Sequence, residues 1–192
     1  IKNDKFKWFQ TSLFIFFLVF GLSTVKDYGI SYDAQEYRQH GFTVLNYIGN
    51  KVAPDKVKKI TNDRNLDFKS IDQSYKGGIN TFKIQHTFYA GIEYLFLKGA
   101  IKKDVYLMRH YLNFLTNFLA LLLFYKILRS KFSRIYSLTG IIFYFLNPKM
   151  LPEFVYNVND LWFTFFIIVF VYSLINYLKK DKKKYLLVLI LS

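Results

Sequence analysis

The sequence predicts an all-α, polytopic membrane protein. Of its 192 residues, 53% are hydrophobic and 21% are aromatic, yet the formal net charge is +14. This composition is too apolar for a basic nucleic-acid-binding arm and too charged for a single soluble core, so charge and apolar residues must be separated along the chain. Basic clusters at 2–7, 126–134 and 179–184 each border an apolar run. We therefore expect a lipid bilayer, and no nucleic acid, as the partner.

Four apolar runs define the complete spans. Those at 8–25, 111–128 and 161–178 are each about 18 residues long, close to the roughly 20 residues that cross about 30 Å of hydrocarbon. The run at 135–148 is shorter and ends in an Asn-Pro pair, so it predicts either a thin, tilted span or a re-entrant helix. A crossing is favoured, because it places all the basic clusters on the cytoplasmic side.

The predicted topology starts with a cytoplasmic N-terminus. A long outer loop covers 26–109, a small outer loop covers 149–160, and a truncated fifth span begins at 185. Loops longer than about 60 residues cross the membrane largely regardless of charge, so the lysines of the long loop do not oppose this arrangement. Because the chain begins with Ile1 and its last apolar run is shorter than a span, we expect 1–192 to be the N-terminal part of a larger transmembrane domain.

A secretory signal peptide is the alternative interpretation of the first apolar run, since a basic start and an apolar core fit one. Further hydrophobic segments follow, so an uncleaved span is favoured. The chain has no Cys, which excludes disulfides and thiolate metal sites. Its many Lys, Ile, Asn, Phe and Tyr residues have AT-rich codons, which points to an AT-rich bacterial genome. For a multi-pass helical protein of a bacterium we expect the inner (plasma) membrane.

The long outer loop is predicted to contain amphipathic surface helices. Within 32–50, apolar residues recur on one side of a helix, while Asp33, Glu36 and His40 fall at i, i+3 and i+7 on another. A second apolar stripe at 88–99 suits a helix that lies flat on the membrane surface.

The small outer loop has an acidic face of its own. Glu153, Asn157 and Asp160 fall at i, i+4 and i+7, and Pro152 is well placed in the first turn of a helix. If both outer loops fold over the same patch, carboxylates from each loop meet at the outer membrane surface.

Cations stand near both acidic groups. Arg109 and His110 open the second long span, and Lys149 opens the small outer loop. A carboxylate can take the proton of an acceptor hydroxyl while one of these cations steadies a phosphate leaving group. The pattern therefore favours transfer of a group from an anionic lipid.

The order of these features resembles the start of the GT-C glycosyltransferases, and more narrowly the protein O-mannosyltransferase and aminoarabinose-transferase type. The matching motifs are Gly-Ile-Ser-Tyr-Asp33-x-x-Glu36 after the first span, Arg109-His110 before the second, Asn147-Pro148 after the short span and Asn157-Val-Asn-Asp160 before the next. The resemblance implies a sugar donor on polyprenyl phosphate, displaced with inversion. The acceptor, whether glycan, lipid or protein, stays open.

The resemblance also implies roles for single residues. Asp33 matches the catalytic base, and Asp160, with Asn157 beside it, matches a second acidic position of the active site. Many members have an acid directly after the leading Asp, whereas Ala34 follows here, so Glu36 is only a supporting candidate. Oxygen ligands for a divalent cation are present, but no dense acidic cluster fixes a metal geometry, and we leave the metal and any cofactor unknown.

Other interpretations remain open. Asp33 and Asp160 could simply cap helices, and Arg109 and His110 could be interfacial anchors. A transporter would place ionisable residues at mid-span, whereas these spans hold only Lys126, near one end. A non-catalytic assembly protein would tolerate substitution of both aspartates.

Overall fold

The structure, a computed structural model, describes residues 2–32, 34–54, 84–97 and 102–180, together with Tyr185 and Val188. All regular secondary structure in these residues is helical. The chain divides into two compact units. We call Ile1–Gly29 with His110–Ser192 the long-helix unit, and Ile30–Arg109 the insert unit.

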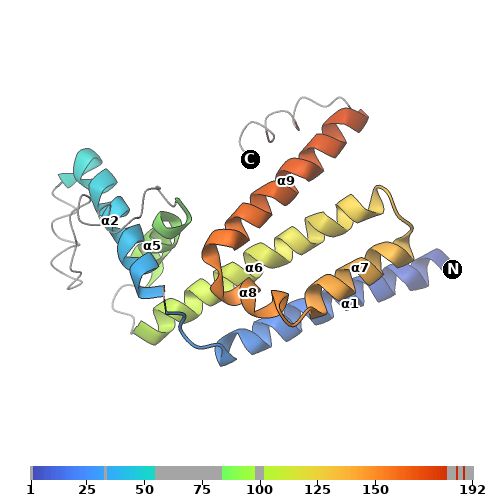
Figure 1. The fold of residues 1–192 in the computed structure, drawn as a ribbon, viewed down its shortest axis with the longest axis horizontal. Helices are drawn as coiled ribbons and strands as arrows, with labels where there is room; N and C mark the ends of the chain where they lie inside the picture. The colour runs from blue at the N-terminus through green and yellow to red at the C-terminus, as the bar shows by residue number, and fades with distance from the viewer. Residues whose placement is uncertain are drawn as a thin grey trace. The chain divides into compact units, whose positions relative to one another are not determined.

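The long-helix unit contains most of the described helices (Figure 1). They are α1 (Lys2–Thr24), the 3-10 turn η1 (Val25–Asp27), α6 (Lys102–Arg129) from His110 onward, α7 (Arg134–Leu146), α8 (Met150–Tyr156) and α9 (Val158–Lys180).

Three helical segments are long and apolar enough to cross a membrane: Phe6–Asp27, Lys103–Arg129 and Val158–Lys179. They confirm long apolar helices at 8–25, 111–128 and 161–178, although α6 begins at Lys102 rather than at 111. The helix at 135–148 is α7, which has 13 residues, so its crossing of a membrane stays a prediction. The predicted fifth span falls almost wholly outside the described residues.

Helices α1, α6 and α7 lie side by side (Figure 1). Phe17 of α1 stacks on Phe145 of α7 with ring centroids 4.1 Å apart, and Phe14 of α1 meets Tyr125 of α6 at 5.3 Å. Gly21 faces the Phe114 ring, whose atoms occupy the place of a Cβ. The core of the long-helix unit therefore combines stacked aromatic rings with buried aliphatic side chains such as Leu121, Leu138 and Ile141.

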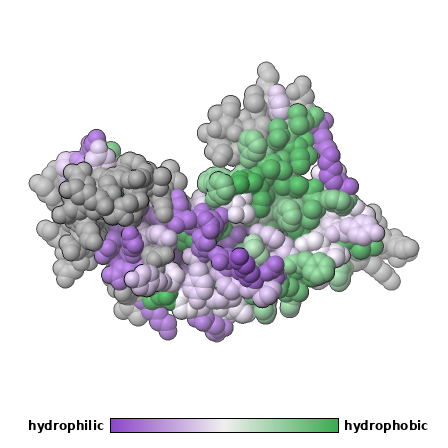
Figure 2. Space-filling view, in the orientation of Figure 1, coloured by the Kyte–Doolittle hydropathy of each residue, from purple (hydrophilic) through white to green (hydrophobic). Residues whose placement is uncertain are grey.

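Helix α9 keeps an apolar surface uncovered. Phe163, Ile167 and Phe170 are exposed, and apolar residues cover much of this helix on the face seen in Figure 2. A helix that is apolar on most of its sides is typical of a membrane span, where lipid covers the exposed side chains.

The insert unit contains α2 (Ala34–Val52), α5 (Ile84–Phe96) and the first turns of α6. Helices thus occupy much of the segments predicted at 32–50 and 88–99, while their contact with a membrane surface stays a prediction. Because neither histidine of this unit has a clear partner in the sequence, both would be expected at the surface, and this expectation is wrong. His40 and His86 are buried, and the Tyr37 ring stacks on the His86 ring at 4.5 Å.

Gly41 permits the close approach of α2 and α5. A Cβ on Gly41 would overlap the backbone carbonyl of His86, whereas a Cβ on Gly91 of α5 would meet nothing within 4 Å. We expect Gly41→Ala to lower the free energy of unfolding by about 1–3 kcal/mol, because backbone cannot move aside cheaply. Gly91→Ala is the matched control and should raise it by up to about 1 kcal/mol, since Ala is the better helix former. Urea unfolding of both variants measures the difference, and equal midpoints would contradict the close approach.

Candidate functional site

A polar pocket lies in the long-helix unit, where α7 ends and α9 begins. Its volume is about 280 Å³. The polar side chains of its lining include Asn117, Tyr144, Lys149, Glu153, Asn157 and Asp160. Four of these come from the short stretch 149–160, which sequence analysis identified as an acidic face with a neighbouring lysine.

The helical conformation is interrupted at two residues beside the pocket, Asn147 and Asn157. Asn147 is extended, with ψ of 120°, as expected for a residue before proline, so α7 ends at Leu146. Helix α8 then runs for 7 residues before Asn157, whose ψ of 83° is not helical. The expected single helical face through Glu153, Asn157 and Asp160 is therefore wrong, because the helix is interrupted at Asn157.

Asn157 and Asp160 form a reciprocal cap at the start of α9. The Asp160 backbone N–H donates to Asn157 Oδ1 at 3.1 Å, and Asn157 Nδ2 donates to Asp160 Oδ2 at 2.7 Å. Asn157 is therefore the N-cap of α9. Asp160, at the third helical position, accepts from the side-chain amide of the cap, whereas the Asn157 backbone N–H donates to the Glu153 carbonyl. Asp160 is exposed, and the orientation of its carboxylate is held by Asn157.

Two asparagines of α6 anchor α8. Asn113 Nδ2 donates to the Val155 carbonyl at 2.7 Å, and Asn117 Nδ2 donates to the Phe154 carbonyl at 3.3 Å. Both carbonyls belong to the last turn of α8, where the backbone carbonyls have no intrahelical partners. Sequence reasoning missed both residues, although two asparagines four apart in an apolar run were a usable signal, because they share one face of the helix.

The pocket combines both signs of charge with hydroxyl and amide groups. Lys149 is exposed, Glu153 is half-buried, and the buried hydroxyl of Tyr144 has no hydrogen-bond partner within the described part of the chain. Such a lining can accept a proton through a carboxylate and donate hydrogen bonds to an oxyanion through Lys149 or Tyr144. A small polar ligand, such as a sugar, fits this chemistry.

His110 lies in an aromatic row of the long-helix unit. Its ring meets that of Tyr156 at 5.6 Å, and Tyr156 meets Tyr28 at 5.3 Å. Burial, helped by Tyr156 and Asp27, raises the pKa of the Tyr28 phenol. Tyr28 therefore stays protonated at neutral pH and can act as a hydrogen-bond donor.

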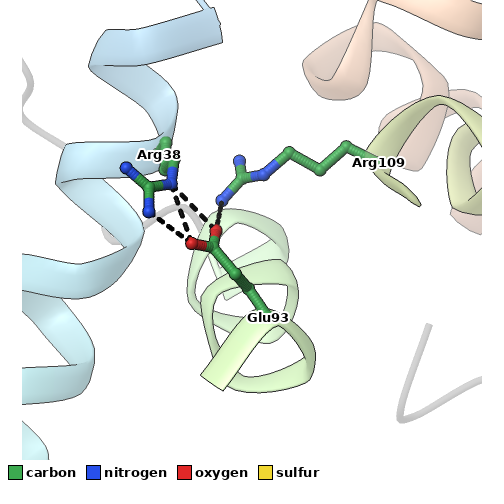
Figure 3. A network of polar contacts seen from close by, with 3 residues as sticks. All are labelled: Arg38, Glu93 and Arg109. Carbon is green, nitrogen blue, oxygen red and sulfur yellow. Dashed lines mark hydrogen bonds and ion pairs between the residues drawn. The ribbon is translucent and has the colours of Figure 1, made fainter. Parts of the chain in front are cut away.

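Arg109 belongs to a charged cluster in the insert unit (Figure 3). Arg38 Nε donates to both oxygens of Glu93, at 2.9 and 3.0 Å, and Arg109 Nη2 donates to Glu93 Oε2 at 3.4 Å. Glu93 is buried, with 1% of its side chain exposed. One carboxylate thus ties together α2, α5 and the start of α6, and sequence analysis identified neither Arg38 nor Glu93.

The structure brings together only part of the predicted site. Lys149, Asn157 and Asp160 line one pocket. Glu36 is exposed in the first turn of α2, and Asp33 lies outside the described residues. Glu36 and His40 were predicted to share one helical face; Glu36 is exposed, whereas His40 is buried.

The described residues include no group of three or more His, Asp or Glu side chains that could hold a metal ion. No protein-family model, curated protein or solved structure matches the chain.

Proposed function

We propose that this chain is part of an integral membrane glycosyltransferase, which moves a sugar from a polyprenyl-phosphate donor to an acceptor at the outer membrane face. The observation that carries the proposal is the polar pocket lined by Lys149, Asn157 and Asp160, next to helices long enough to cross a membrane. A site of this kind can receive a hydrophilic sugar while the polyprenyl chain stays in the lipid.

In the proposed reaction, the Asp33 carboxylate takes the proton of an acceptor hydroxyl. The acceptor oxygen then attacks the anomeric carbon, and the bond from that carbon to the phosphate oxygen breaks with inversion. Polyprenyl phosphate leaves with the electron pair, and cationic groups stabilise its charge. Arg109, His110 and Lys149 are the candidate cations.

Asp160 and Glu36 have supporting roles in this proposal. Asp160 is held by Asn157, so its free oxygen can accept a hydrogen bond from a sugar hydroxyl at a fixed position. Glu36 is exposed, and it follows Asp33 closely in the sequence. Its carboxylate can therefore bind the acceptor. A divalent cation at these carboxylates stays open.

The distribution of charge in the long-helix unit supports an orientation. Lys126 lies over the Tyr172 ring at 5.8 Å, and Lys179 Nζ donates to the Ser130 carbonyl at 3.3 Å. Lys126 is closer to the C-terminal end of α6, and Lys179 closer to the C-terminal end of α9, than the residues of those helices that line the pocket. Basic residues are retained on the cytoplasmic side of bacterial inner membranes. The proposed topology therefore has a cytoplasmic N-terminus, α7 as a thin crossing and the pocket outside.

Cysteine labelling tests this orientation, because the chain has no Cys of its own. Single cysteines at Glu36 and Asn157 should react with a membrane-impermeant maleimide added to intact cells, whereas one at Lys131 should react only after the membrane is opened. Labelling of Asn157 and Lys131 from the same side would contradict the crossing by α7.

A donor-turnover assay tests the function itself. Membranes containing the protein are incubated with a radiolabelled polyprenyl-phosphate sugar and an acceptor extract, and released polyprenyl phosphate is measured together with labelled product. We expect release that depends on the acceptor. Uptake of the intact sugar without cleavage would instead support a transporter. The absence of both release and uptake would support a non-catalytic assembly protein.

A further inference from the structure

The Arg38–Glu93–Arg109 cluster has an excess of positive charge. Two guanidinium groups share one carboxylate, and within the described part of the chain no other carboxylate contacts either arginine. The side chains of Glu93 and Arg109 are 1% and 5% exposed. Buried charges are normally neutralised, because removing an ion from water is costly, so a net positive charge at this place calls for an anion.

Hydrogen-bond donors are left over in the same cluster. Arg38 contacts Glu93 through Nε and Nη2 only, which leaves Nη1 outside the pair. Arg109 reaches Glu93 through Nη2, while its buried Nε has no hydrogen-bond partner in the described residues. Figure 3 shows the two guanidinium groups approaching the carboxylate from different helices. A buried N–H without an acceptor lowers stability, so the Nε of Arg109 favours a further acceptor, and Nη1 of the partly exposed Arg38 can donate to the same group.

We propose that Arg38 and Arg109 form a binding site for a phosphate group and that Glu93 holds the two guanidinium groups in position for it. A singly charged phosphate would neutralise the cluster. Phosphate oxygens point in several directions and can accept from two guanidinium forks at once, whereas a carboxylate offers two oxygens in one plane. Arg38 is 24% exposed, which gives the site an edge at the surface.

The phosphate has two candidate sources, a free phosphate compound and a lipid phosphate, and both present the same chemistry. The inference extends the role given to Arg109 in the proposed function. Binding is nevertheless measured without any sugar transfer, so its failure is distinguishable from the failure of the transferase proposal.

The test measures thermal unfolding of the full chain in detergent micelles. Inorganic phosphate and geranyl phosphate are titrated separately against sodium chloride at equal ionic strength. We expect the unfolding temperature to rise with phosphate and not with chloride. A response to inorganic phosphate identifies a free-phosphate site, and a response to geranyl phosphate alone identifies a lipid-phosphate site. If neither compound stabilises the protein beyond chloride, the inference is wrong.

Two arginine variants locate the site. Arg38→Lys keeps the charge but loses the planar fork, so it should weaken phosphate binding by about tenfold or more. Arg129→Lys is the matched control, because Arg129 lies in the long-helix unit and donates to a backbone carbonyl. Equal phosphate responses in the two variants would overturn the assignment to Arg38.

Replacement of the carboxylate gives an independent readout. Glu93→Gln keeps a side-chain oxygen that can hold the guanidinium groups but removes their negative charge, so its unfolding temperature should fall. Phosphate then supplies the missing negative charge and should raise the unfolding temperature by more than the wild type gains. A purely structural ion pair would show no such recovery. A constant deficit at every phosphate concentration would therefore count against the site.

Discussion

Asp33→Asn is expected to reduce sugar transfer by about 10²–10⁴-fold, the usual contribution of a general base. The substitution keeps the size of the side chain but removes the group that accepts the proton of the acceptor hydroxyl. The measurement is the initial rate of polyprenyl phosphate release from donor in membranes with matched amounts of protein. Insertion and topology should be unchanged, because they depend on the apolar length of the spans and on the basic residues beside them, and this variant alters neither. The cysteine labelling pattern checks this.

Asparagine also separates catalysis from helix capping. Asn and Asp are about equally good N-cap residues, so a capping role for Asp33 predicts nearly normal transfer by Asp33→Asn. Glu36→Gln is the matched control, because it removes a carboxylate one helical turn away, from the exposed first turn of α2, and should have a smaller effect. Normal transfer by Asp33→Asn would remove the base role, whereas equal loss in both variants would assign the chemistry to the pair.

The long apolar helices could be predicted from sequence because their signal is local. A run of about 18 apolar residues in lipid forms a helix, because its backbone groups must be hydrogen-bonded within the segment. The end of α7 is set by Pro148, which disfavours the helical conformation at Asn147. The residues 149–160 also lie together for a local reason, since short segments on either side of a turn cannot separate far.

Long-range contacts could not be predicted in this way. The partner of Glu93 is not a neighbour in the sequence, because its ion pair with Arg38 spans 55 positions. Only the packing of α2 on α5 reveals this ion pair. The same packing buries His40 and His86, which look like surface residues in a polar loop. The break at Asn157 was missed because spacing alone placed Glu153 and Asp160 on one helix, whereas Asn157 caps α9.

Glu93→Leu should destabilise the insert unit more than any other single substitution considered for it, by about 3–5 kcal/mol. The change removes the carboxylate that both Arg38 and Arg109 contact and leaves uncompensated guanidinium charge among buried side chains. Hydrogen exchange measures the effect segment by segment. We expect faster exchange in α2 and α5 than in the wild type, while α1 and α7 of the long-helix unit exchange at unchanged rates.

A triple replacement shows whether the loss comes from charge or from packing. Arg38→Met, Glu93→Leu and Arg109→Met together remove all three charges and keep similar side-chain volumes, and buried ion clusters replaced in this way are often neutral or stabilising. Slow exchange in α2 and α5 should therefore return in the triple variant, although phosphate should no longer stabilise it. Exchange as fast as in Glu93→Leu would mean that the geometry of the ion cluster itself holds α2 against α5. Unchanged exchange in Glu93→Leu would instead mean that apolar packing, which includes the fully buried Tyr89 of α5, is sufficient without the cluster.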